Sequence, residues 1–415
     1  MTAQKRFVKS KESLTALMTR YYSENHALAI AGKFVAWIAI IVPVEILKGF
    51  DIVVAVPENH AAMCAARGVG ASQAERAERL GYSMDLCSYA RIDLGTAFAN
   101  GEGSPSMGLP RPNLVISNTN NCSLLVKWFD IYRREFAIPH FVLDVPFCYE
   151  PQRETDREYI IDQFGDLIRF LEKITGQSFD IEKVEEAVRH TDEANAHWKR
   201  FLSHAARHPS GITVFDTFIH MAPFITSFRG TPELSRHMKL LADEAEELAE
   251  NNIVPVPGEK YRLLWDNIAP WHQLRAMSTR LRDLSATICS ASYTSCVGTV
   301  EGELDCYRYD GGDPLSYLAR IQNFSVCPYG MDLRFKVMGE TIERLKIDGV
   351  VFSSNRSCKP YSLMQMDLER SVKEKYGIPT IMIDVDHADS RKYNESNVFL
   401  KLEALIEEIE AGRRA

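Results

Sequence analysis

The chain has 415 residues, of which 46% are hydrophobic and 25% are charged, and its formal net charge at pH 7 is −8. This composition is that of a globular protein, and the length exceeds what one hydrophobic core usually serves, so we expect two or three domains. The acidic balance argues against a nucleic-acid-binding protein, because such proteins present a basic face to the phosphates.

Residues 1–30 predict an amphipathic helical cap at the N-terminus. They carry charges and lack the apolar core of a secretory signal. The apolar run that follows from Phe34 is interrupted by Pro43 and Glu45, and it is shorter than the ~20 apolar residues that a membrane-spanning helix needs. We therefore expect a cytoplasmic protein with no membrane-spanning segment.

Residues 31–155 predict a first α/β domain. Apolar, β-branched runs that indicate strands cover 34–42, 51–57, 113–117 and 140–146. Helical patterns lie between them, around 70–98 and 123–136. Near-continuous apolar strands that alternate with helices are typical of a parallel sheet covered on both faces.

Residues 156–250 predict a helical insert, because they are rich in Glu, Arg, Ala and Leu with the 3.6-residue period of a helix. Residues 251–415 predict a second α/β domain. Its expected strands are 261–267, 285–291, 348–354 and 379–386. Its expected helices are 269–283, 331–346, 361–376 and 396–411.

The two α/β domains contain the same sequence arrangement. One copy begins LVISNTNNCSLLVKWF at Leu114, and the other begins VVFSSNRSCKPYS at Val350. Each copy is typical of a βαβ unit: a strand, a polar loop with a cysteine, a helix, an Ile-Pro pair and a second strand with an Asp at its end. We therefore predict two pseudo-equivalent parallel-sheet domains of the flavodoxin or Rossmann-like kind. Each cysteine would lie at the carboxyl edge of its sheet, where such folds bind ligands.

The chain has nine cysteines, an odd number in a sequence without an export signal, so disulfides are not expected. No CxxC pair occurs, which argues against a zinc site built from local loops. Any cysteine ligands of a metal must therefore come from loops that are distant in sequence.

Cys122 and Cys358 occupy equivalent positions at the start of a predicted helix, and Cys87 in GYSMDLCSYAR opens another. A helix N-terminus lowers the pKa of a thiol and favours the metal-binding thiolate. Three such thiols match an iron–sulfur cluster without a fourth protein thiolate, whose open iron would bind water or substrate. Taken singly, each also fits an ordinary half-buried cysteine. The duplicated loop favours the ligand interpretation for Cys122 and Cys358.

The other cysteines give weaker signals. Cys289 lies within an apolar strand and is expected in the core, and Cys64 and Cys148 are expected to serve packing. Three cysteines in loop-rich sequence stay open as an additional ligand, with the last as the first choice: Cys296, Cys306 and Cys327.

A second candidate site is the stretch VPENHAAMCAARG, which begins at Val56. Glu58 follows a predicted strand, and partial burial at that edge would raise its pKa and suit it to general acid or base catalysis. The alternative is a solvent-exposed Glu58 beside a helix-capping Asn59. The chain has no GxxxxGK[ST] motif, so we do not expect it to hydrolyse ATP itself.

In combination, GYSMDLCSYAR, NTNNCSLLVKWF and SNRSCKPYS resemble the three cysteine motifs of the 2-hydroxyacyl-CoA dehydratase and benzoyl-CoA reductase family. Their order and spacing extend the resemblance over essentially the whole chain. PENHAAMCAARG and NRSC are most similar to the larger, α-type dehydratase subunit, and FRGT and ASYT are similar to the corresponding benzoyl-CoA reductase subunit.

The resemblance implies a [4Fe–4S] cluster with one non-cysteine iron site, held by Cys87, Cys122 and Cys358. It implies a second dehydratase-like subunit, or a second copy of this chain, and an ATP-hydrolysing iron–sulfur activator protein that supplies one electron. The implied reaction eliminates water from an (R)-2-hydroxyacyl-CoA through a ketyl radical and gives an enoyl-CoA. Glu58 matches a glutamate of the family's active site.

One position departs from the family's pattern. Dehydratases of this type often have a serine in the strand before the VP element, at the position of Ile40. Loss of that hydroxyl leaves two further functions open: a subunit of a benzoyl-CoA-type (aryl-CoA) reductase, or a homodimeric double-cubane reductase. A scaffold or electron-transfer subunit, whose partner carries out the chemistry, is a third class.

Overall fold

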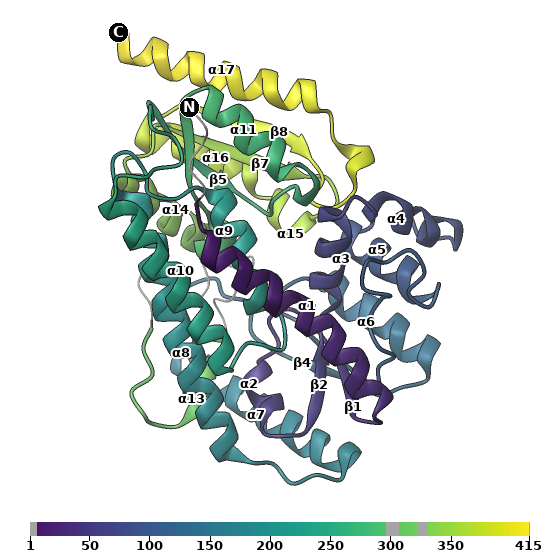
Figure 1. Cartoon of the computed structure of the whole chain (residues 1–415). Coiled ribbons are helices and arrows are strands. Elements are labelled where there is room, and N and C mark those ends of the chain that lie inside the picture. The colour runs from purple at the N-terminus through teal and green to yellow at the C-terminus, as the bar shows by residue number, and fades with distance from the viewer. Residues whose placement is uncertain (1–5, 296–306, 323–329, 415) are drawn as a thin grey trace.

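The computed structural model describes residues 6–295, 307–322 and 330–414. Two four-stranded sheets, each entirely parallel, organise the chain into two α/β units (Figure 1). The strand order is β2-β1-β3-β4 in the first sheet and β6-β5-β7-β8 in the second, so the two sheets have the same topology. The predicted α/β fold class, with two pseudo-equivalent parallel sheets, is confirmed.

All eight predicted strands are present, and most are shorter than their apolar runs. The first sheet contains β1 (Phe34–Ile38), β2 (Ile52–Ala55), β3 (Leu114–Asn118) and β4 (His140–Leu143). The second contains β5 (Tyr261–Asp266), β6 (Ala286–Ala291), β7 (Gly349–Asn355) and β8 (Thr380–Val385). The central strands β3 and β5 are buried at every residue, as expected for parallel strands that are covered on both faces.

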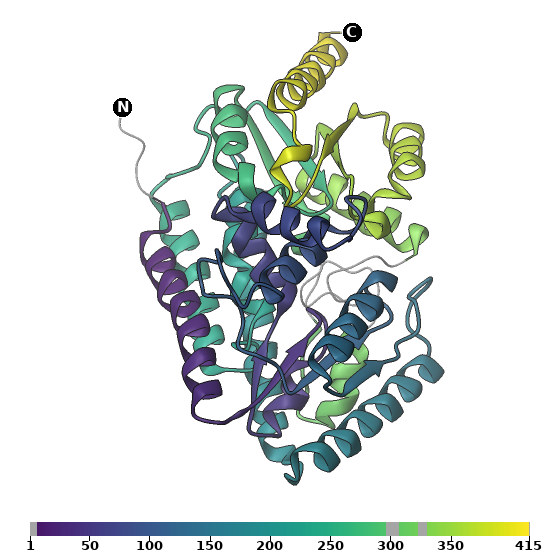
Figure 2. The same ribbon diagram turned by 90° about the vertical axis from the view of Figure 1, so that its right-hand side faces the viewer.

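Five helices accompany the first sheet: α2 (Val44–Lys48), α3 (Pro57–Ala66), α4 (Gly70–Arg79), α5 (Ser88–Ala97) and α6 (Ser123–Phe136). The helical pattern predicted around 70–98 is divided into α4 and α5. Gly81 lies between them with a φ of 97°, a left-handed conformation that glycine adopts at little cost. In Figures 1 and 2 the helices α3, α4 and α5 lie between the first sheet and the second.

A helical layer follows the first unit, made of α7 (Glu154–Thr175), α8 (Ile181–Ser203), α9 (Val214–His220) and α10 (Pro232–Glu250), with two 3₁₀ turns at His204–Ala206 and Ala222–Ile225. The N-terminal helix α1 (Val8–Ile30) packs along α10. Within the described ranges, no helix is both long and apolar enough to cross a bilayer.

The second unit contains α11 (Leu274–Asp283), α12 (Ser292–Ser295), α14 (Met331–Leu345), α15 (Lys359–Ser362), α16 (Gln365–Tyr376) and α17 (Glu395–Arg414), with 3₁₀ turns at Trp271–Gln273 and Ser390–Lys392. Between α12 and α14 in the sequence lies α13 (Pro314–Gln322). Helix α13 packs against α7 and α8. Gln322, its last residue, donates from Nε2 to the carbonyl of Ile41 at 2.9 Å, next to β1. Part of the predicted second domain therefore contacts the first unit. The domain boundaries remain predictions.

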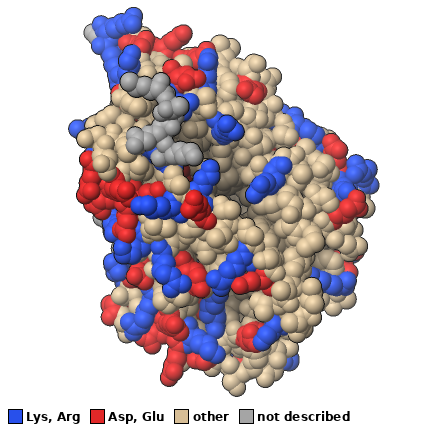
Figure 3. All heavy atoms as spheres, in the orientation of Figure 1, with Lys and Arg blue, Asp and Glu red and all other residues tan. Residues whose placement is uncertain are grey.

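Charged side chains of both signs are intermixed on the face shown in Figure 3, over the helical layer and both units. The chain also carries 48 Lys and Arg against 56 Asp and Glu. This face therefore lacks the continuous basic surface that binding to a nucleic-acid backbone requires.

Tight packing of α5 on α4 gives a test of the fold. A Cβ at Gly95 would lie 2.0 Å from the carbonyl oxygen of Gln73, a backbone atom that cannot move away alone. We predict that Gly95→Ala lowers the unfolding free energy by about 1–3 kcal/mol, measured by urea unfolding, because the two helices must separate. Gly412→Ala in α17, where no atom lies within 4 Å, is the control and should be neutral or slightly stabilising. Equal effects of the two changes would contradict the packing.

Candidate active site

The three candidate cysteines each occupy the N-cap position of a helix: Cys87 of α5, Cys122 of α6 and Cys358 of α15. Cys122 and Cys358 follow the carboxyl ends of the equivalent strands β3 and β7, so the duplicated sequence occupies the same position in both units. All three side chains are half-buried. The positions predicted at the starts of helices are therefore confirmed.

The three thiols lie close enough to affect one another's ionisation. Burial raises the pKa of Cys87 well above its usual range, and the charges of Cys358 and Cys122 add to the rise. Burial also raises the pKa of Cys358 to about 12, and Cys122 contributes. The structure thus brings together side chains that are 35 to more than 200 residues apart in sequence.

The expected lowering of the thiol pKa values is wrong for the metal-free chain. The backbone N–H groups of Leu124 and Leu125 do lower the pKa of Cys122, but burial outweighs them and the net shift is upward. The same balance holds at the other two thiols. The free-energy cost of burying a thiolate is larger here than the stabilisation that the N–H groups of the first helix turn provide. The thiols therefore stay protonated unless a metal cation takes the place of their protons.

The three thiols have the donor chemistry of an iron–sulfur cluster. Within the described part of the chain, no group of three or more His, Cys, Asp or Glu side chains is compact enough to hold one metal ion. A cluster spreads its ligands over several irons and takes cysteine thiolates as its usual donors. Cys87, Cys122 and Cys358 are half-buried thiols, of which Cys122 raises the pKa of the other two, and they are donors of the type that such a cluster takes. Of the other cysteines considered as ligands, Cys296, Cys306 and Cys327 lie outside the described residues.

Glu58 lies in the first turn of α3, and only 6% of it is exposed. Its Oε1 accepts a hydrogen bond of 3.0 Å from the backbone N–H of Ile40, and its Oε2 has no partner among the described residues. Burial raises the pKa of Glu58 to about 8, so the carboxyl group is mostly protonated at neutral pH. Its charge also contributes to the raised pKa of Cys122, so the two groups interact electrostatically. The alternative of a solvent-exposed Glu58 is wrong.

Asn59 is not the helix cap that the alternative interpretation expected. The N-cap of α3 is Val56, and Asn59 lies inside the helix, where its Oδ1 accepts a hydrogen bond of 2.8 Å from the hydroxyl of Tyr22. The side chain of Ile40 is buried, and its backbone carbonyl accepts a hydrogen bond of 3.3 Å from Arg229, part of the FRGT motif. Ile40 therefore positions Glu58 through its backbone and adds no hydroxyl.

A buried carboxylate, Asp93 of α5, joins the helices that carry the candidate residues. Its Oδ1 pairs with His60 Nδ1 of α3 at 2.7 Å, and its Oδ2 accepts a hydrogen bond of 2.5 Å from the hydroxyl of Tyr132 of α6. Trp128 Nε1 donates to the same hydroxyl at 2.7 Å. Helices α3, α5 and α6 are thus joined through the Asp93 side chain. Glu58 lies in the first turn of α3, and Cys87 and Cys122 are the N-caps of α5 and α6.

The hydrogen bond with Asp93 also raises the pKa of His60. Burial alone lowers the pKa of His60, but hydrogen bonds with Asp93 and Cys64 outweigh it and raise the pKa to about 10. His60 is therefore a buried cation at neutral pH, paired with Asp93. The sequence did not predict the contact of Asp93 with His60 and Tyr132, because the three residues are far apart in the chain. The available signal was a polar residue on the buried side of each helix.

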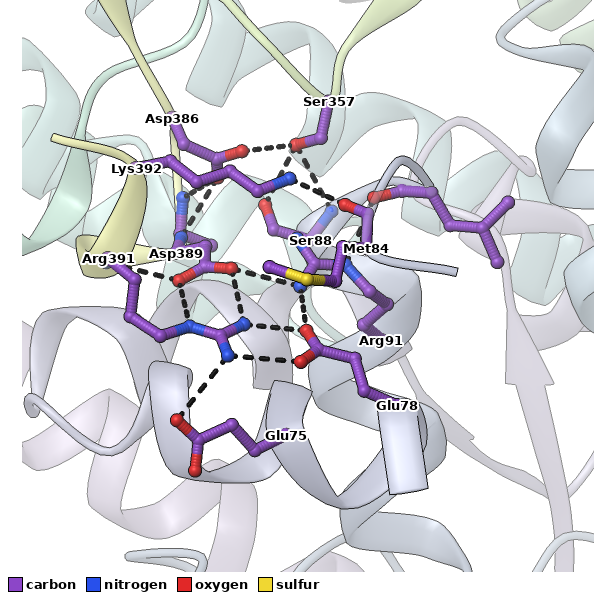
Figure 4. A network of polar contacts seen from close by, with 12 residues as sticks. Glu75, Glu78, Met84, Ser88, Arg91, Ser357, Asp386, Asp389, Arg391 and Lys392 are labelled. Atoms are coloured by element: carbon purple, nitrogen blue, oxygen red, sulfur yellow. Dashed lines mark hydrogen bonds and ion pairs between the residues drawn. The ribbon is translucent and has the colours of Figure 1, made fainter. Parts of the chain in front are cut away.

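Ion pairs join the two units close to Ser88, the residue that follows Cys87 in the sequence (Figure 4). Arg91 of α5 is fully buried, and its Nη1 contacts Glu78 at 2.6 Å and Asp389 of the second unit at 2.9 Å. Arg391 pairs with the same two carboxylates and with Glu75. We call Arg91, Glu78, Asp389 and Arg391 the interdomain ion-pair cluster.

Known proteins resemble this chain along nearly its whole length. A family model described as the 2-hydroxyglutaryl-CoA dehydratase D-component matches residues 39–409. The α subunit of (R)-phenyllactyl-CoA dehydratase from Clostridium sporogenes is 33% identical over 92% of this chain and 91% of its own length. The α subunit of lactoyl-CoA dehydratase from Anaerotignum propionicum is 30% identical over 98% of both chains. One of the benzoyl-CoA reductase subunits from Thauera aromatica is 25% identical over 89% of this chain and 87% of its own.

The raised pKa of Glu58 predicts a pH-dependent cost in stability. Between the usual pKa of 4.5 and about 8, the unfolded state releases the proton that the folded state keeps, so wild-type stability falls as pH rises. We predict that Glu58→Gln, which mimics the protonated form, gains stability over the wild type by about 1.4 kcal/mol per pH unit across this window. Urea unfolding at pH 5, 6, 7 and 8 measures the difference. Glu158→Gln, on an exposed surface, is the control; a constant difference for Glu58→Gln would contradict the shift.

The connection through Asp93 gives a second prediction for this site. Asp93→Asn removes the carboxylate that compensates the buried His60 cation, and we expect a loss of about 3 kcal/mol in unfolding free energy. The control is Asp384→Asn, which breaks an exposed pair with Arg356 and should cost at most about 1 kcal/mol. Similar losses for the two variants would show that Asp93 does not join the three helices.

Proposed function

Because the chain belongs to the 2-hydroxyglutaryl-CoA dehydratase D-component family, we propose that it is the iron–sulfur subunit of a radical (R)-2-hydroxyacyl-CoA dehydratase. Its reaction would eliminate water from a 2-hydroxyacyl-CoA and give an enoyl-CoA. The observation that carries the proposal is the placement of Cys87, Cys122 and Cys358 at three helix N-termini, together with a buried and protonated Glu58.

In this proposal Cys87, Cys122 and Cys358 hold a [4Fe–4S] cluster, with one iron site left without a cysteine. Such a cluster supplies one-electron reduction and a Lewis-acidic position for the thioester oxygen or the leaving hydroxyl. The backbone N–H groups at the helix starts offset the negative charge of the thiolates: those of Tyr89 and Ala90 at Cys87, and that of Tyr361 at Cys358.

Glu58 is the proton-handling group of the proposal. With one oxygen held by the N–H of Ile40 and the other free of partners among the described residues, Oε2 is available to give a proton to a leaving hydroxyl or to accept one from the acyl chain. A pKa near 8 suits both directions of transfer at neutral pH. The buried surroundings of Glu58 exclude water from that exchange.

The relatives that carry the name "alpha subunit" support a partner for this chain. We propose that it pairs with a second dehydratase-like subunit or with itself, and that a separate ATP-hydrolysing iron–sulfur activator supplies the electron. No GxxxxGK[ST] motif occurs in this sequence, which agrees with ATP hydrolysis on another protein.

A second candidate function is an aryl-CoA reductase subunit of the same family, with the homodimeric double-cubane reductase as a variant. The similarity to the benzoyl-CoA reductase of Thauera aromatica favours it, and so does the buried Ile40, which presents no hydroxyl next to Glu58. A 2-hydroxyacyl substrate would have to bind without that hydroxyl. Product chemistry separates the two functions, because an enoyl-CoA keeps the redox level of its substrate and a reductase product does not.

We predict that the anaerobically reconstituted chain binds about four irons and four sulfides, and that each change of Cys87, Cys122 or Cys358 to Ser lowers this content by more than half. Iron and sulfide assays with an electron paramagnetic resonance spectrum measure it. Cys289→Ser, a buried cysteine of β6, is the control and should load normally. Wild-type protein that binds no iron would end the proposal.

Glu58→Gln separates chemistry from electron transfer in the same preparation. With partner and activator present, we expect it to keep its iron and lose at least about 100-fold in turnover, because an amide cannot transfer the proton. Full turnover with Glu58→Gln would make the chain an electron-transfer subunit.

A further inference from the structure

His387 of the second unit reaches the Cys87 thiol of the first. Its Nε2 lies 3.7 Å from Cys87 Sγ and 3.0 Å from the hydroxyl oxygen of Ser88. The ring is fully buried and packs edge-on against Tyr89, with 4.4 Å between the ring centroids. His387 follows β8 by two residues, so its position depends on how the second unit is placed against the first.

A chain of buried hydroxyl groups connects His387 to a carboxylate. Ser357 Oγ lies 2.6 Å from Asp386 Oδ2, and Ser88 Oγ lies 3.2 Å from Ser357 Oγ (Figure 4). Burial alone raises the pKa of Asp386, but His387 and the hydroxyl groups outweigh it and hold the pKa at about 2, so Asp386 is an ionised acceptor. Ser357 must therefore donate to Asp386. The Ser88 hydroxyl also hydrogen-bonds Asp386, and the Ser88 backbone N–H donates to Ser357 Oγ at 3.2 Å.

This order determines which ring nitrogen of His387 carries the proton. Its Nε2 is the ring nitrogen with partners among the described residues, Ser88 Oγ and Cys87 Sγ. The single proton of Ser88 points toward Asp386, so its oxygen faces His387 as an acceptor, and Nε2 must donate. Nδ1 has no partner among the described residues, and a buried nitrogen lone pair without a partner is tolerated better than a buried N–H without one.

We propose that His387 is a positioning residue for Cys87. The Nε2–H of His387 is shared between Ser88 Oγ and the Cys87 sulfur, and Ser88 is held in place for it by Asp386 and Ser357. This proposal rests on the proposed function, because the N–H acts on a cluster ligand. A donor to a ligating thiolate stabilises the added negative charge of the reduced cluster and raises its reduction potential. His387 belongs to the second unit and Cys87 to the first, so the contact between the two units influences the reduction potential of the cluster.

The test compares variants of the cluster-loaded chain. His387→Phe keeps a ring against Tyr89 but has no N–H, and His387→Gln keeps an N–H. We expect His387→Phe to retain its iron and to show an oxidised-to-reduced ratio about tenfold higher than wild type at a fixed potential, in a redox titration followed by electron paramagnetic resonance. His387→Gln should recover most of the difference. His237→Phe, a buried histidine of α10 that contacts Ser13, is the control.

A second readout does not need the cluster. In the metal-free chain, loss of the N–H donor should slow the alkylation of Cys87 at fixed pH about tenfold, quantified by mass spectrometry of its peptide. Unchanged alkylation and an unchanged potential in His387→Phe would overturn the proposal. If the wild type binds no iron but alkylation slows as expected, the contact is supported and the proposed function fails.

Discussion

The candidate site depends on one buried carboxylate. Asp93 lies on the helix that Cys87 begins, and it binds the helix of Glu58 through His60 and the helix of Cys122 through Tyr132. The three helix N-termini are therefore fixed relative to one another before any ligand binds. Metal-binding side chains must be held within a fraction of an ångström of their binding geometry. Buried hydrogen bonds to a charged side chain provide that rigidity, and the packing of the surrounding core offsets the free-energy cost of burying the charge.

The site is also kept electrically neutral by burial. The three thiols and Glu58 have raised pKa values, so each holds its proton at neutral pH when no metal is present. The same low-polarity surroundings that oppose ionisation of these groups strengthen their interaction with a positive centre. Burial therefore keeps Glu58 protonated at neutral pH, as the dehydratase proposal requires.

The sequence predicted the sheets well because parallel strands are nearly continuous apolar runs, and the repeated loop around Cys122 and Cys358 anticipated the identical order of the two sheets. It also located the cysteines at helix starts. It failed on the direction of the thiol pKa shifts, because the degree of burial depends on tertiary packing. His60, Arg91 and His387 could not be assigned a role, since their partners Asp93, Asp389 and Cys87 are distant in the chain and become neighbours only when the helices pack.

The interdomain ion-pair cluster has a consequence for how the molecule moves. Arg91 is fully buried, and separating it from Asp389 would leave a guanidinium and a carboxylate buried without their partner. The free-energy cost would be several kcal/mol for each charge. We infer that this buried ion pair resists separation of the two units next to Cys87. A relative motion of the units would then be smallest at the ion pair and larger farther from it.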